Sequence, residues 1–198
     1  MNIHFLRHFQ SEVNPCEGFD NLSLEDRRRI QMEATLLPND LNLRLARSIG
    51  LFVRTILPEE TRVFTSEHQR AVDTLAMVLD DVEFEIDPLL NERDFGQYSL
   101  LSKPTIISRD PNYREERRSD PIGWKPPDGE SYLDVKTRLG EFIQANYDPG
   151  TSVFCVTHET VIYAAMDLLS GIGTYGIIEK ARKGSMPLGF YYSAKVEQ

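Results

Sequence analysis

Cysteine is scarce in this chain, whose 198 residues include only Cys16 and Cys155. Two cysteines are too few for a disulfide framework, and neither has a second cysteine at the spacing of a metal site, so we expect both thiols to be reduced. Apolar runs are also far shorter than the roughly 18 residues that a membrane span needs. Because Met1 leads directly into a strand-like segment instead of a signal peptide, we expect a cytoplasmic protein without membrane contact.

Positive charge is in short supply as well, since 22 lysines and arginines stand against 31 aspartates and glutamates, which gives a formal charge of −9. This charge repels polyanions at long range, which argues against nucleic acid as a partner and requires any phosphate binding to be local. With 40% hydrophobic and 27% charged residues, the composition is typical of a globular protein. The length favours a single domain over residues 1–198.

No repeat or low-complexity tract interrupts the sequence, and the apolar residues follow periods of 2 and 3.6 in alternating segments. The segments with a period of 3.6 predict helices. Because parallel strands need crossover connections, the alternation predicts a three-layer α/β/α sandwich with a mainly parallel sheet. Short β-branched and aromatic runs predict the strands at residues 2–6, 62–65, 83–86, 152–157 and 188–193.

Several local signals mark the predicted helices. An apolar stripe runs over residues 41–56. Residues 66–69 and 131–134 have the form of capping boxes, in which a serine is followed three residues later by a glutamine or an acidic residue. A further helix over 160–169 is apolar nearly all round, which predicts that it is buried.

Two long stretches, 15–39 and 97–128, do not follow this alternation. We expect both to be irregular insertions that serve either as functional lids or as mobile segments. The second stretch mixes arginines with acidic residues, which is the pattern of a solvated, ion-paired face. The alternative is a lid whose arginines recognise a second acidic group on a substrate.

Ligands of an open α/β sheet bind beyond the carboxyl ends of its strands. At these ends the first predicted strand leads to Arg7 and His8, the second to Arg70, the third to Glu92 and the fourth to His158. Guanidinium groups bind phosphate oxygens bidentately, a neutral imidazole can attack phosphorus, and a carboxylic acid can protonate the departing alkoxide. These residue types therefore predict the binding and cleavage of a phosphate ester.

The residues around these positions form five blocks that keep their order along the chain, LRHFQSEVN at 6–14, SEHQRAVDT at 66–74, LNERDFG at 90–96, PPDGES at 126–131 and VTH at 156–158. Together these blocks resemble the signature of the histidine phosphatase superfamily, also called the phosphoglycerate mutase-like superfamily. The resemblance implies a phosphoglycerate mutase-like fold and a phosphatase that works through a phosphohistidine, without a metal or another cofactor.

The resemblance also implies a role for each matching residue. It makes His8 the nucleophile and Glu92 the proton donor to the leaving group. The residues themselves leave two alternative donors open, which are Asp94, two residues after Glu92, and Glu12, near His8 in the sequence. The expected partner is a small phosphorylated substrate, and the sequence leaves open whether the protein is a monomer or a homodimer. The residues that would bind the phosphate oxygens are Arg7, Arg70, His158, Asn14 and Ser11.

Two residues depart from the family pattern, in which glycine usually follows each of the two site histidines. Here Phe9 follows His8, and Glu159 follows His158. A backbone N–H survives both changes, but a carboxylate directed inward would oppose a bound dianion. We therefore expect Glu159 to point away from the site.

Three other prominent side chains have less reactive interpretations. His4 alternates with apolar residues in a predicted strand and is expected in the core. His68 lies at a predicted helix start and is expected at the rim of the site. Trp124 either packs in the core or closes the substrate pocket.

The sequence leaves three other activities open. A mutase would use the same chemistry, but mutases of this type usually carry a longer insertion and a tail over the site. This sequence ends soon after its last predicted strand, so we expect hydrolysis. A non-catalytic module that binds phosphorylated ligands would be consistent with Phe9 and Glu159. A metal-dependent hydrolase built on His8, His158 and Glu92 is disfavoured, because two arginines beside the site would repel a cation.

Overall fold

The computed structural model describes residues 1–14 and 18–197. Within these residues five strands form one sheet, in the order β3-β2-β4-β1-β5. Four strands are parallel, and β5 runs antiparallel to β1, so the predicted mainly parallel sheet is confirmed. The strands are β1 (Asn2–Arg7), β2 (Arg62–Thr65), β3 (Glu85–Ile86), β4 (Ser152–Thr157) and β5 (Tyr191–Lys195).

The central strand β4 is buried along its whole length, as its run of β-branched and aromatic residues predicts for a strand between two parallel neighbours. On one side it pairs with β1, where Arg7 lies opposite Thr157. On the other side it pairs with β2, where Thr65 lies opposite Val156. This register brings the carboxyl ends of the three strands level at one edge of the sheet.

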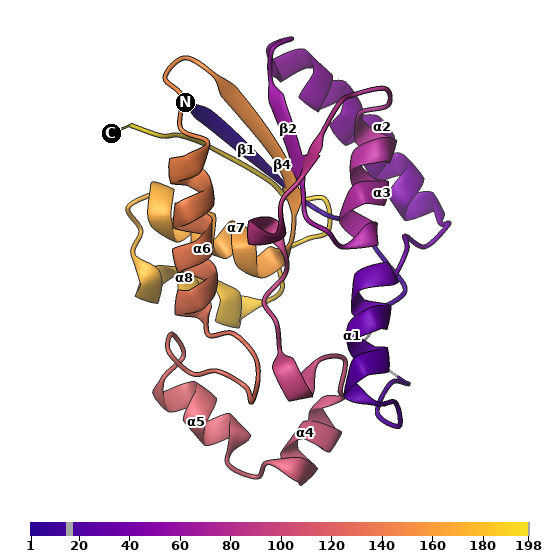
Figure 1. Ribbon diagram of the computed structural model, residues 1–198, viewed down its shortest axis with the longest axis vertical. Helices are drawn as coiled ribbons and strands as arrows, with labels where there is room; N and C mark the ends of the chain where they lie inside the picture. Colours follow the sequence, from indigo (N-terminus) through magenta and orange to yellow (C-terminus); the bar gives the residue numbers. More distant parts are fainter. Residues whose placement is uncertain (15–17, 198) are drawn as a thin grey trace.

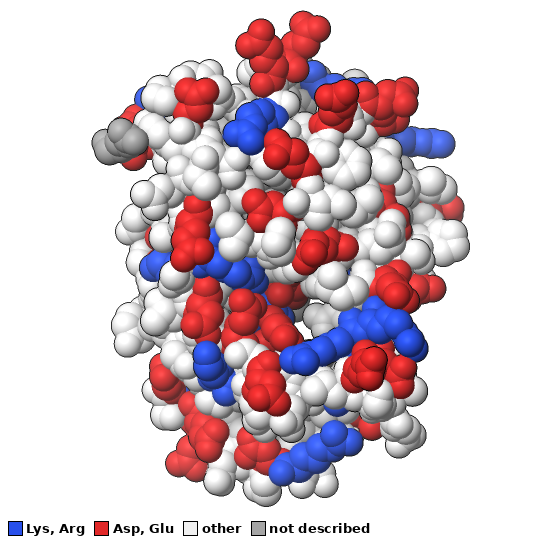
Figure 2. Space-filling model, viewed as in Figure 1, with Lys and Arg blue, Asp and Glu red and all other residues white. Residues whose placement is uncertain are grey.

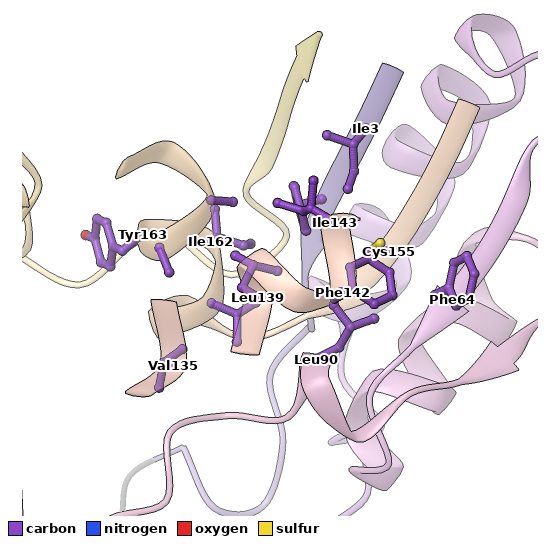
Figure 3. Close-up of a cluster of buried hydrophobic side chains, with 14 of the residues drawn as sticks. Ile3, Phe64, Leu90, Val135, Leu139, Phe142, Ile143, Cys155, Ile162 and Tyr163 are labelled. Atoms are coloured by element: carbon purple, nitrogen blue, oxygen red, sulfur yellow. The ribbon is translucent and has the colours of Figure 1, made fainter. Parts of the chain in front are cut away.

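Helices cover both faces of the sheet, so the three-layer arrangement is confirmed (Figure 1). Helices α2 and α3 lie on one face, and α6, α7 and α8 lie on the other. A hydrophobic cluster fills each interface, and Figure 3 shows the one beside α6, where Phe142 packs edge-on against Phe64. The helices are α2 (Asp40–Ile56), α3 (Gln69–Val78), α6 (Tyr132–Ala145), α7 (Glu159–Leu169) and α8 (Thr174–Lys183).

One of the two predicted capping boxes is present. At the start of α6 the hydroxyl of Ser131 accepts from the backbone N–H of Asp134, whose carboxylate accepts from the backbone N–H of Ser131. The capping box predicted at Ser66 is wrong, because α3 begins after His68, which makes no side-chain cap hydrogen bond. The hydroxyl of Ser66 instead lies 2.8 Å from Nε2 of His158. A long-range contact thus replaces the local cap.

The stretches predicted to be irregular contain helices. Residues 15–39 include α1 (Leu24–Glu33), and residues 97–128 include α4 (Lys103–Arg109) and α5 (Tyr113–Ser119). Figure 1 shows all three on the side of the sheet toward which β1 runs. The sequence does not reveal these helices, because they are short and highly charged and so lack an apolar stripe of several turns.

Trp124 packs in a hydrophobic cluster formed by residues of the 97–128 stretch. Of the two predicted roles, a core position and closure of the substrate pocket, the structure therefore shows the first. Its ring lies 5.4 Å from the ring of Tyr113 in an edge-on arrangement. Arg27 of α1 donates from Nη1 to the carbonyl oxygen of Ser99 at 3.0 Å, which ties α1 to the same region. The buried members of this hydrophobic cluster are Tyr98, Leu101, Ile106, Tyr113 and Trp124.

One of the two cysteines lies on a strand of the sheet. Cys155 is a buried free thiol on β4, as predicted, whereas Cys16 lies outside the described residues. In the described part of the chain, no helix combines the length and the apolar character that crossing a bilayer requires. His4 is partly buried on β1, and its Nδ1 lies 2.5 Å from the hydroxyl of Tyr191 on β5.

Candidate active site

The carboxyl edge of the sheet brings together His8, Arg70 and His158. His8 follows β1, His158 follows β4, and Arg70 lies in the first turn of α3. The rings of His8 and His158 are 5.0 Å apart, and all three side chains are buried. Residues that are distant in the sequence thus form one cluster, as the position of the strand ends predicts.

The backbone fixes the orientation of the His8 ring. Its Nδ1 lies 2.6 Å from the carbonyl oxygen of Phe9, and because a carbonyl only accepts, Nδ1 carries the hydrogen. The lone pair of the neutral ring is therefore on Nε2, which lies 3.3 Å from Nε of Arg70. The nitrogen of His8 that has a free lone pair thus lies next to a guanidinium group.

Arg70 extends its guanidinium group across the cluster. Its Nη2 lies 3.4 Å from Nδ1 of His158 and 3.0 Å from Nδ1 of His68. Its Nη1 donates to the carbonyl oxygen of Gln31 at 2.5 Å, so α1 helps to hold the side chain in place. Because arginine keeps its charge at any working pH, a permanent positive charge lies against the imidazoles.

His158 is the residue before α7, and its side chain is completely buried. Since Nδ1 faces a donor of Arg70, the ring hydrogen is on Nε2, which lies 2.8 Å from the hydroxyl of Ser66. The first turn of α7 has backbone N–H groups without partners inside the helix, and the helix dipole is positive there. This position favours an anion beside His158.

Burial keeps the histidines of the cluster neutral at pH 7. It is the main cause that lowers the pKa of both His8 and His158 well below the ordinary value of 6.5, and the charge of Arg70 lowers both further. The pKa of His68 falls to about 3 for the same two reasons, in the same order. A neutral imidazole has a free lone pair and is the form that can act as a nucleophile.

The prediction that His68 lies at the rim is wrong. The residue is 4% exposed, and its ring lies edge-on to that of His158, with the centroids 4.6 Å apart. A signal for this position exists in the sequence, because His68 lies two residues after Ser66 in the segment that leads into α3. His68 has extended backbone angles, and alternate residues of an extended segment share one face.

Arg7 forms an ion pair that the sequence analysis did not predict. Its Nη2 lies 2.9 Å from Oε2 of Glu159, so the expectation that Glu159 points away is wrong. The other carboxylate oxygen accepts from the backbone N–H of Met186 at 3.0 Å. Because Arg7 lies opposite Thr157 in the sheet, a long side chain two residues later can reach it. Burial raises the pKa of Glu159, and the charge of Arg7 partly offsets this effect.

Glu92 lies between the 3₁₀ turns η1 (Pro88–Leu90) and η2 (Gly96–Tyr98). It lines a cavity of about 380 Å³, and His68 forms another part of the same wall. Oε1 of Glu92 accepts from the backbone N–H of Arg93 at 2.8 Å. A carboxyl group is thus present in a cavity that also borders the histidine cluster.

The alternative proton donors are engaged in structural contacts. Asp94 lines the same cavity, but it accepts from the backbone N–H of Gly96 at 2.7 Å and pairs with Arg28 at 3.2 Å. Glu12 is exposed and accepts from the backbone N–H of Thr35 at 3.2 Å.

Among the residues that the structure describes, no three histidine, cysteine, aspartate or glutamate side chains are grouped so that they could hold a metal ion.

Ser11 and Asn14 lie in the turn that follows β1 and contact each other. Oδ1 of Asn14 lies 2.7 Å from the backbone nitrogen of Ser11 and 2.9 Å from its hydroxyl oxygen, and both groups donate to it. Ser11 is buried, whereas Asn14 is exposed. Their predicted role in phosphate binding stays a prediction.

A second cavity, of about 900 Å³, has a strongly basic wall. Glu159 and Thr160 from the start of α7 line it, together with residues of the 97–128 stretch and of α8. Figure 2 shows basic and acidic side chains close together in the lower half of one face of the molecule. The basic residues that line the cavity are Arg93, Lys103, Arg114, Arg117 and Arg118.

This fold and this cluster of side chains agree with what the family comparison shows. A model of the histidine phosphatase superfamily (branch 1) matches residues 3–178. The chain therefore belongs to this superfamily.

Named relatives fall into two groups. A 6-phosphofructo-2-kinase/fructose-2,6-bisphosphatase of Caenorhabditis elegans is 29% identical over 171 residues, which cover 82% of this chain and 34% of that protein. The match thus covers about a third of the length of that relative. A 2,3-bisphosphoglycerate-dependent phosphoglycerate mutase of Methylorubrum populi is 28% identical over 166 residues, which cover 78% of this chain and 77% of the mutase.

Solved structures show the same fold at lower sequence identity. The α-ribazole phosphatase of Shigella flexneri superposes with a TM-score of 0.72 at 21% identity, over 100% of this chain and 92% of that one. A mycobacterial glucosyl-3-phosphoglycerate phosphatase superposes with a TM-score of 0.70 at 22% identity, over 97% of this chain and 91% of the other.

Proposed function

We propose that this protein is a metal-independent phosphatase that hydrolyses a phosphate monoester through a phosphohistidine on His8. The observation that carries the proposal is the state of the His8 ring. Its Nδ1 donates to the carbonyl oxygen of Phe9, and its unprotonated Nε2 lies 3.3 Å from Nε of Arg70. Membership of the histidine phosphatase superfamily supports the same chemistry.

The phosphate group binds at the carboxyl edge of the sheet. The guanidinium groups of Arg7 and Arg70 hold its oxygens, because they supply charge-assisted hydrogen bonds that persist at any working pH. His158 contacts the same group at the start of α7, where the helix dipole favours negative charge.

In the first chemical step, Nε2 of His8 attacks phosphorus. A P–N bond forms, the P–O bond to the leaving group breaks, and the proton of the Glu92 carboxyl group goes to the departing alkoxide. The two arginines stabilise the charge on the transferring phosphoryl group. The cavity lined by Glu92 provides the space for the leaving group.

In the second step, water attacks the phosphohistidine. Glu92, now a carboxylate, takes a proton from the water, the P–N bond breaks, and inorganic phosphate leaves with His8 restored to its starting form.

The basic wall of the 900 Å³ cavity supports a substrate with a second acidic group. The arginines of this wall would bind that group.

The test is the release of inorganic phosphate from an aryl phosphate in the presence of a metal chelator. Sustained release supports the proposal, and activity that disappears with the chelator contradicts its metal independence. Parallel incubation with 3-phosphoglycerate separates hydrolysis from the mutase alternative, because a mutase forms the isomer instead of free phosphate. Saturable binding of phosphate esters without any turnover would show a binding module and overturn the proposal.

A further inference from the structure

The ion pair between Arg7 and Glu159 lies at the proposed phosphate site. Nη2 of Arg7 is 2.9 Å from Oε2 of Glu159, and the arginine side chain is 10% exposed. Nε of Arg7 is buried, and no hydrogen-bond acceptor for it is found among the described residues. The guanidinium group therefore has one donor held by a carboxylate and another that still needs an acceptor.

A bound phosphate dianion and the Glu159 carboxylate compete for the same positive charge. Each is an acceptor for the N–H groups of Arg7, and two negative groups that share one guanidinium group repel each other. Salt screens this repulsion only weakly, because both side chains of the pair are largely buried. Phosphate at Arg7 is therefore bound more weakly while Glu159 stays in place.

We propose that Glu159 is an internal counter-ion of Arg7 that an incoming phosphate group displaces, so that it weakens the binding of inorganic phosphate at the end of each turnover. This inference rests on the proposed function only in placing the phosphate group at Arg7. It makes Glu159 a residue that sets the affinity of the site, and not a reacting group.

A displaced carboxylate has other cationic groups within the same region. Glu159 lines the 900 Å³ cavity whose wall carries five basic side chains. Moving toward this wall breaks the hydrogen bond from the backbone N–H of Met186, which is 3.0 Å long. A displaced carboxylate therefore faces positive charge in this cavity and is not a buried charge left alone.

The experiment measures the dissociation constant of inorganic phosphate by calorimetry at fixed pH and ionic strength. Glu159→Gln removes the charge and keeps an acceptor for the Met186 N–H. We expect it to bind phosphate about tenfold more tightly, which corresponds to about 1.4 kcal/mol. Glu159→Asp keeps the charge on a shorter side chain and is expected to give an intermediate constant.

The matched control is Glu179→Gln on α8. Glu179 is an exposed carboxylate paired with Lys183 at 3.1 Å, so the control makes the same change in net charge outside the site. Its phosphate affinity should equal that of the wild type. If Glu159→Gln binds phosphate as weakly as the wild type or more weakly, Glu159 merely positions Arg7 and the inference is wrong.

A direct measurement of phosphate binding distinguishes a failure of this inference from a failure of the proposed function. A wild type that binds phosphate but releases none from aryl phosphates would overturn the proposed hydrolysis and leave the comparison of Glu159 variants valid. Normal hydrolysis with unchanged phosphate binding in Glu159→Gln would overturn the inference alone. Should Glu159→Gln not fold, Glu159→Asp still tests the inference, because tighter phosphate binding than in the wild type supports it and unchanged binding overturns it.

Discussion

Phe9 orients the proposed nucleophile through its backbone while its side chain anchors the loop in the core. Its carbonyl oxygen lies 2.6 Å from Nδ1 of His8, and its backbone N–H donates to the hydroxyl of Thr74 at 2.9 Å. The phenyl ring is 0% exposed and belongs to the hydrophobic cluster under α2 and α3. A residue that departs from the family pattern thus fixes the imidazole by a contact with the main chain.

Phe9→Ala should therefore lower the free energy of unfolding by about 3 to 5 kcal/mol, because truncating a buried phenylalanine removes apolar contacts and leaves a cavity. Urea denaturation followed by circular dichroism measures this change. The matched control is Phe84→Ala, since Phe84 is 42% exposed, and it should cost about 1 kcal/mol or less. Equal losses for the two variants would show that Phe9 does not anchor the loop.

The buried histidines should make stability fall in mild acid. In the unfolded chain they gain protons near pH 6.5, whereas in the folded protein their pKa values are lower, and that of His68 is about 3. The unfolded state then binds more protons between these values. Each such histidine should lower the free energy of unfolding by up to about 1.4 kcal/mol for each pH unit below 6.5.

His68→Asn isolates one of these contributions, because the asparagine oxygen can replace Nδ1 as an acceptor for Arg70. Urea unfolding at pH 7, 6, 5 and 4 should show a shallower loss of stability in this variant than in the wild type, with the difference growing as the pH falls. Parallel pH profiles for the two proteins would mean that His68 is not held neutral by the fold.

Glu92→Gln should slow esters with poor leaving groups far more than activated aryl phosphates. General acid catalysis contributes about 10² to 10⁴ in rate, and a good leaving group needs little of it. The measurement is kcat on an alkyl and on a nitrophenyl phosphate. Asp94→Asn serves as the comparison, since Asp94 supports the backbone N–H of Gly96 and should affect both substrates alike. If Glu92→Gln does the same, the proton donor is another residue.

The sequence predicts the sheet well where local pattern and long-range pairing agree. The run at 152–157 is buried in the centre, as its composition indicates. The last strand begins at Tyr191 and not at residue 188, because the backbone N–H of Phe190 donates to the carbonyl oxygen of Pro187 and Gly189 has a φ of +69°. These features make a turn from residues whose side chains alone suggest a strand.

The sequence predicts which side chains meet in the site where these residues directly follow paired strands. The pairing of Arg7 with Thr157 places His8 near His158 whatever the loops do. The contacts of Ser66 with His158 and of Glu159 with Arg7 depend on the packing of separate segments, and neither has a local signal. The expectation for Glu159 is wrong because it considers only repulsion from a bound dianion, whereas the guanidinium group of Arg7 offers the carboxylate an ion pair.

The central claim, that His8 carries the phosphoryl group, is tested most directly by trapping the phosphoenzyme. The protein is mixed with a labelled phosphate ester and quenched in alkali, and the modified peptide is identified by mass spectrometry. We predict an acid-labile phosphate on His8, and neither label nor turnover in a His8→Ala variant that keeps the circular dichroism spectrum of the wild type. Label on another residue, or normal turnover in His8→Ala, would contradict the account.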